Sequence, residues 1–114
     1  MKIMACVPQK EVMYNIPKNA YELNITLLVR DEQSGLNGFI GGKLSLKNDE
    51  HLFYKDSYGS ECDHPTKKWI QQNKVFQKQV EKLDEQFFQI LYEKPEIKEV
   101  YGQLKKYKEN EKDA

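Results

Sequence analysis

Cys62 and His64 stand two residues apart in the sequence, and both side chain types are common zinc ligands. A zinc ion needs four ligands, or three and a water molecule, and the other soft ligands of the chain are Cys6 and His51. Such a site would require the fold to join three distant segments, and no C-x-x-C spacing supports it. The sequence therefore favours no metal, with His64 as a helix cap and Cys6 as a small core residue.

Cys62 could also act as a nucleophile, because it precedes a predicted helix and a helix N-terminus lowers the pKa of a thiol. His51 or His64 would then serve as the base. However, no motif supplies an oxyanion pocket or a third residue that orients the base. Paired carboxylates, phosphoryl-transfer motifs and cofactor signatures are also missing from the sequence. We therefore expect no enzyme and no cofactor, and a cysteine-dependent enzyme is the weakest alternative.

The segment Ser34–Lys43, SGLNGFIGGK, contains four glycines and ends on a lysine, as phosphate-binding loops do. A Walker A loop has the pattern G-x-x-x-x-G-K-[ST], but here Asn37 occupies the first glycine position and Leu44 follows the lysine. The two adjacent glycines, Gly41 and Gly42, lie within a predicted strand. This placement indicates a β-bulge, or a close approach by another backbone or a ligand.

Because glycine has no side chain, the surface at Gly41 and Gly42 could hold a nucleotide-like, anionic small molecule. Lys43 would pair with its charge, and nearby tyrosines would stack on a base. A nucleic-acid polymer is not expected, because the chain has 18 basic and 18 acidic residues and a single arginine. The candidate ligand-binding residues are Gly41, Gly42, Lys43, Arg30, Tyr54 and Tyr58.

The elements that position these residues are predicted to form one α+β domain over residues 1–114, a length typical of a single domain. Alternation of apolar and polar residues predicts an antiparallel meander of four or five strands in a β-rich part, residues 1–58. The strands are expected near 3–7, 12–16, 23–30, 39–46 and 51–55, with a loop over 56–63. Leu28 lies among polar positions, which suggests that both sheet faces are partly covered.

After residue 63 the apolar period changes from two to about 3.5, which predicts helices over 64–108. A long amphipathic helix should begin at Pro65, capped by Asp63 or His64. Pro95 should begin a shorter C-terminal helix, since proline suits the first helical position and disrupts a helix interior. The tail, residues 109–114, is expected to fray.

The apolar stripe of the long helix follows a coiled-coil-like heptad and is broad, so it could contact a second protomer as well as the sheet. This pattern predicts a homo-oligomer, a dimer or higher. In the alternative, the stripe packs only on the sheet of its own chain. The predicted oligomer interface consists of Trp69, Asn73, Phe76, Val80, Leu83, Phe87 and Ile90.

Cellular context and function are predicted from composition. Two cysteines, no signal-peptide pattern and no apolar run of about twenty residues indicate a cytoplasmic protein without membrane contact. Seventeen lysines against one arginine suggest an AT-rich genome, and short chains without catalytic motifs are typical of phage or mobile-element accessory proteins. We expect a non-enzymatic inhibitor or regulator that binds a host macromolecule such as a host protein. The alternative is a protein that sequesters a nucleotide-like small molecule.

Overall fold

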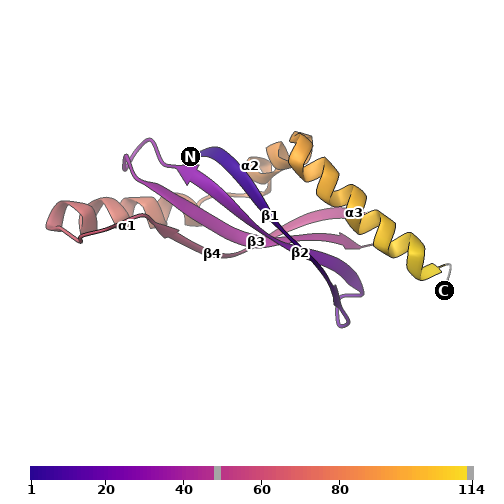
Figure 1. The fold of residues 1–114 in the computed structure, drawn as a ribbon. Coiled ribbons are helices and arrows are strands. Elements are labelled where there is room, and N and C mark those ends of the chain that lie inside the picture. The colour runs from indigo at the N-terminus through magenta and orange to yellow at the C-terminus, as the bar shows by residue number, and fades with distance from the viewer. Residues whose placement is uncertain (48–49, 113–114) are drawn as a thin grey trace.

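The computed structural model describes residues 1–47 and 50–112, and these form a four-stranded antiparallel sheet followed by helices (Figure 1). The strands are β1 (Lys2–Asn15), β2 (Ala20–Arg30), β3 (Asn37–Lys47) and β4 (Glu50–Ser60). Each strand pairs with the next along the chain, in the order β1-β2-β3-β4. The predicted α+β fold with an antiparallel meander is therefore confirmed.

The strands are longer than the sequence pattern suggested. The two short strands predicted at the N-terminus form the single strand β1, whose pairing with β2 is irregular between Pro8 and Val12. An edge strand tolerates Pro8, because its missing N–H can face away from the sheet. The loop expected from Asp56 is wrong, since β4 continues to Ser60. A bulge at Gly41 and Gly42 is confirmed, and Asp56 is the extra residue on the partner strand.

The helical part is divided differently from the prediction. It consists of α1 (Lys67–Glu81), α2 (Glu85–Gln89), the 3-10 helix η1 (Ile90–Glu93) and α3 (Pro95–Lys112). The single long helix is wrong, because the Asp84 carboxylate accepts a hydrogen bond from the Phe87 N–H at 3.2 Å and caps a new helix.

Both ends of the helical part also differ in detail. The cap of α1 is Thr66, whose Oγ1 accepts from the Trp69 N–H at 3.1 Å, and not Asp63 or His64. Pro95 does begin the C-terminal helix as predicted, but α3 has 18 residues and α1 has 15, so it is not the shorter one. The tail expected to fray from 109 is helical as far as Lys112, and residues 113–114 lie outside the described residues.

The helices cover one face of the sheet, with α1 toward one end and α3 toward the other (Figure 1). Their apolar residues and those of β2 and β3 form one buried core, which explains the alternation in β2. The molecule is elongated, 57 × 23 × 21 Å. None of the helices in the described ranges has the length and apolar character needed to cross a membrane. The largest fully buried side chains include Leu23, Ile25, Leu27, Ile40, Leu44, Phe76, Val80, Leu91, Ile97 and Leu104.

Candidate functional site

The second face of the sheet, here called the open face, carries exposed apolar side chains. Leu28 lies opposite Phe39 across β2 and β3, on the face away from the buried core. Val7 is 51% exposed, Leu28 42%, Phe39 40% and Tyr54 39%. The expectation from Leu28 that both faces are partly covered holds at one end of this face, where the paired residues Glu22 and Ser45 are 2% and 1% exposed. Around Leu28 the face is open, and the helices of the described residues pack on the other face.

The apolar residues of the open face form an ordered row. Strand pairing aligns Ala5, Leu28, Phe39 and Gly59 across all four strands. A Cβ atom built on Gly59 would lie 3.0 Å from Cε1 of Phe39, so the missing side chain leaves room for the Phe39 ring to lie against β4. A ring supported in this way loses little freedom when it is buried by a partner.

Basic residues lie beside this row, toward one end of the strands. Lys2 and Arg30 are paired across β1 and β2 on the open face, and both are exposed. The Arg30 guanidinium donates from Nη1 to the Asn37 Oδ1 at 3.0 Å, a bond that restrains the long side chain. This end of the open face therefore presents a positioned positive charge.

Basic residues also lie at the other end of the open face. Lys43 pairs with Tyr54 across β3 and β4, and Lys18 reaches over from the β1–β2 turn. The Lys18 Nζ is 4.4 Å from the centroid of the Tyr54 ring, a cation–π contact that occupies one face of the ring. Two carboxylates offset part of this positive charge: Asp56, in the bulge of β4, and Glu22, two residues along β2 from the Asn24 that pairs with Lys43.

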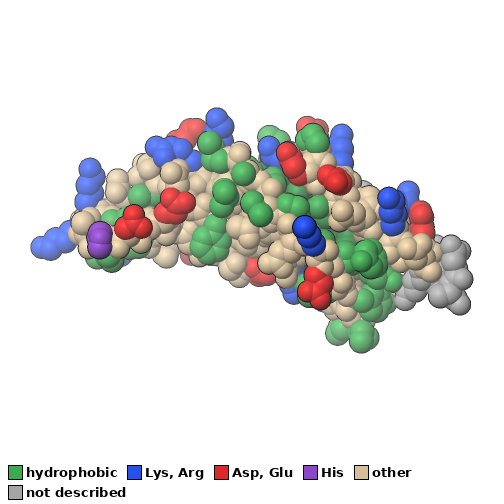
Figure 2. Space-filling model, in the orientation of Figure 1, with side chains coloured by type: hydrophobic (Ala, Val, Ile, Leu, Met, Phe, Trp, Pro, Cys, Tyr) green, Lys and Arg blue, Asp and Glu red, His purple; other side chains and the backbone are tan. Residues whose placement is uncertain are grey.

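A shallow hollow of about 370 Å³ lies beside Lys43, under the β1–β2 turn. Tyr14 and Ile16 help to line it, and hydrophobic side chains gather at this projecting turn, where Ile16 is 79% exposed (Figure 2). Glu22 also lines the hollow although it is 2% exposed. Its Oε1 accepts from the Asn15 Nδ2 at 2.9 Å, whereas its Oε2 has no hydrogen-bond partner within residues 1–47 and 50–112. The sequence pattern gave no sign of Glu22, which stands at an ordinary polar position of a strand.

The six predicted ligand-binding residues do not share one surface. Gly42 and Tyr58 face the helices: the Phe53 ring lies over Gly42, and the Tyr58 hydroxyl donates to the Glu81 carboxylate at 2.9 Å, which raises the pKa of Tyr58. The space above Gly41 is taken by the Ser57 hydroxyl. The residues on the open face are Arg30, Gly41, Lys43 and Tyr54.

The predicted oligomer interface mostly faces the sheet of its own chain. Phe76 and Val80 have no exposed surface, and Leu83 and Phe87 are partly buried against the same core, so a second protomer could not reach the first two. The other residues of the predicted oligomer interface make local contacts or stay exposed. Asn73 accepts from the Ser60 hydroxyl, the Trp69 Nε1 donates to the Glu61 carbonyl at 3.0 Å, and Ile90 is 56% exposed. Self-association stays a prediction, and it would have to use surfaces other than the buried part of the predicted interface.

The cysteines and histidines do not converge. Cys6 lies in β1 and Cys62 follows β4, so they belong to opposite edges of the sheet, about 14 Å apart at the usual strand spacing. Cys62 and His64 are both exposed, and the side chain of His51 lies outside the described part. Among the described residues, no three His, Cys, Asp or Glu side chains are grouped closely enough to hold a metal ion.

The two thiols should differ in reactivity. Cys6 is partly buried, and burial raises its pKa, so less of the reactive thiolate is present at neutral pH. Cys62 is exposed. We expect iodoacetamide to label Cys62 at least about tenfold faster than Cys6 at pH 7, as measured by peptide mass spectrometry. In urea the two rates should become similar, and equal rates in the folded protein would contradict the placement of Cys6.

Comparison with protein-family models, with curated proteins and with solved structures found no match for this chain. A functional proposal therefore rests on the geometry of the open face and of the cavities.

Proposed function

We propose that the protein is a non-enzymatic inhibitor or regulator, of the type that phages and mobile elements encode, and that its open face docks on an acidic surface of a host protein. The observation that carries this proposal is the row of exposed apolar side chains on that face, with Leu28 and Phe39 at its centre. Contiguous exposed apolar surface on a small protein commonly marks an interaction site.

The size of the open face sets a limit on such an interface. The strands β2, β3 and β4 each have 11 residues. With about 3.4 Å per residue and about 4.8 Å between strands, four strands give a face of about 700 Å². A standard protein–protein interface buries about 800 Å² on each partner. Because Glu22 and Ser45 are buried at one end of this face, its exposed part is smaller than 700 Å², and the edges of the sheet would have to contribute to one side of a stable complex.

The charges around the row favour an acidic protein as the partner. Lys2 and Arg30 lie at one end of the face, and Lys18 and Lys43 at the other. Complementary charge at the rim of an interface raises the association rate and fixes orientation. The balanced total charge and the single arginine argue against a nucleic-acid polymer, as the sequence indicated.

The test begins with capture of proteins from a lysate of the host, followed by purification of the captured protein and measurement of its affinity for defined variants. Phe39→Glu places a carboxylate at the centre of the row, and we expect it to weaken binding about 30-fold or more, as at an interface hot spot. Because Phe39 is 40% exposed, this variant should remain folded, which circular dichroism would show.

Ile70→Glu is the matched control, because it puts the same charge on another exposed apolar residue, 46% exposed in α1. We expect its affinity for the partner to equal that of the unaltered chain. Equal weakening by both variants, or no effect of Phe39→Glu, would overturn docking through the open face. Light scattering during size-exclusion chromatography would show whether the open face instead pairs two copies of the chain.

A second candidate function, sequestration of a small molecule, is favoured by the hollow beside Lys43. A negatively charged ligand in this hollow could pair with the Lys43 ammonium. Native mass spectrometry of protein isolated gently from host lysate would test this function. A bound mass of a few hundred daltons that disappears in Lys43→Met would support it, and ligand-free protein would exclude it for that lysate.

A further inference from the structure

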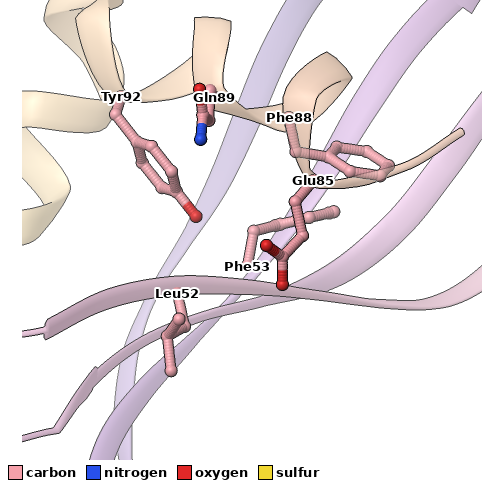
Figure 3. Close-up of a pocket in the computed structure, with 6 residues that line it drawn as sticks. All are labelled: Leu52, Phe53, Glu85, Phe88, Gln89 and Tyr92. Atoms are coloured by element: carbon pink, nitrogen blue, oxygen red, sulfur yellow. The ribbon is translucent and has the colours of Figure 1, made fainter.

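A second cavity, of about 180 Å³, lies between β4 and the α2–η1 segment, on the covered side of the sheet. Tyr92 and the Glu85 carboxylate point from the helical segment toward β4, and the Phe53 side chain extends from β4 toward the helical segment (Figure 3). Phe88 and Gln89 of the same helical segment also line the cavity. The Leu52 side chain points to the opposite side of the strand, so this residue contributes mainly its backbone (Figure 3).

Aromatic rings form the walls of this cavity. The ring centroids of Phe53 and Phe88 are 4.8 Å apart, and those of Tyr92 and Tyr101 are 5.8 Å apart. The Tyr101 hydroxyl also donates a hydrogen bond to the Leu52 carbonyl at 3.2 Å. This bond joins α3 to β4 beneath the cavity. The rings are therefore fixed by contacts within the chain, and the cavity does not depend on a ligand to form.

The electrostatic character of the cavity is negative. Among the described residues that line it, Glu85 is the only charged one, and its carboxylate, on an exposed residue, points toward β4 (Figure 3). The Tyr92 and Tyr101 hydroxyls are neutral at physiological pH, and burial moves the pKa of both further above it. The surrounding segment, residues 81–96, has five acidic and two basic side chains.

We propose that this cavity binds an organic cation, a guanidinium or alkylammonium group. Electron-rich ring faces attract such cations, and a carboxylate at the same place supplies the opposite charge. The Gln89 side-chain carbonyl adds an oxygen atom that can accept a hydrogen bond from the cation. The group belongs either to a free amine or to an arginine or lysine side chain of another protein. This site is separate from the open face and does not rest on the function proposed for it.

The test is an NMR titration of the ¹⁵N-labelled chain with methylguanidinium, compared with methylurea, which is neutral and of similar shape. We expect methylguanidinium to shift the amide signals of Phe53, Phe88 and Tyr92 with millimolar affinity, and methylurea to bind at least about fivefold more weakly. Equal binding of the two probes, or no shift with methylguanidinium at about 100 mM, would overturn the proposal.

Three exposed positions allow the charge to be varied without disturbing the core. Glu85→Gln should weaken methylguanidinium about threefold to fivefold, and Gln89→Glu should strengthen it by about threefold. Glu93→Gln removes a nearby carboxylate that does not line the cavity and should leave the affinity unchanged. An effect of Glu93→Gln equal to that of Glu85→Gln would show a general attraction of cations rather than a site.

The source of the cation is distinguished with blocked arginine, N-acetyl-arginine amide. If the cavity takes a side chain from another protein, the blocked amino acid should bind at least as well as methylguanidinium, because the cavity opens to solvent and the backbone can remain outside. If the cavity takes a free amine, the added backbone should weaken binding. Either result agrees with a cation site, provided that Glu85→Gln reduces the affinity of the probe that binds.

Discussion

Replacing Phe76 with alanine is expected to lower the free energy of unfolding by about 4 kcal/mol. The Phe76 ring is completely buried and lies where α1 meets the sheet, against Gly38. A Cβ atom on Gly38 would lie 2.5 Å from Cζ of the ring, so ring and glycine fit each other closely. Alanine would leave a cavity that neither the rigid strand nor the helix backbone can close. Urea denaturation followed by circular dichroism would measure the loss.

Phe39→Ala is the matched control. Phe39 is also a phenylalanine, but it lies on the face of β3 that is opposite to the one covered by Phe76, and it is 40% exposed. We expect a loss of about 1 kcal/mol or less, since little buried contact is removed. A similar loss for both variants would mean that the two faces are equally buried, which would contradict the assignment of the open face. Because Phe39→Ala should remain folded, it is also suitable for binding measurements.

The sheet could be predicted from the sequence because its signal is local. Leu23, Ile25, Leu27 and Val29 alternate with mostly polar residues, and this period matches the two faces of a strand. The bulge could be predicted for the same reason, from two adjacent glycines in a strand. The end of β4 could not be predicted in this way, because Asp56 is the extra residue of the bulge and interrupts the alternation that marks a strand.

The helix break was missed because the apolar spacing continues through it. Val80, Leu83 and Phe87 keep the heptad although α1 ends at Glu81, since all three contact the same core from separate helices. The available signal was Asp84 followed by Glu85, a helix start in which the aspartate caps the N-terminus. The end of α1 determines which residues of the predicted oligomer interface remain exposed. It also allows the separate α2–η1 segment to form the cavity around Glu85. Neither the open face nor this cavity could be predicted, because both depend on where the helices lie.

Replacing Gly42 with alanine is expected to lower the free energy of unfolding by about 2 to 3 kcal/mol, although alanine adds one methyl group to a buried apolar region. The added Cβ would lie 2.3 Å from the Tyr54 carbonyl oxygen and 2.7 Å from Cζ of Phe53. The Phe53 ring can rotate, but the Tyr54 oxygen belongs to the backbone of β4. Relief therefore requires β3 and β4 to separate at the bulge, which weakens their hydrogen bonds. Urea denaturation again gives the measurement.

Gly102→Ala should have the opposite sign, and this comparison isolates the close contact at Gly42. Gly102 lies inside α3, and no atom is within 4 Å of a Cβ built there. Alanine at this position should stabilise the protein by about 0.5 to 1 kcal/mol, because glycine is a poor helix former. Both substitutions restrict the unfolded chain to a similar degree, so that contribution cancels when the two are compared. If Gly42→Ala also proved neutral or stabilising, the approach of β4 to Gly42 would be wrong, and the bulge would retain the open floor that a small ligand needs.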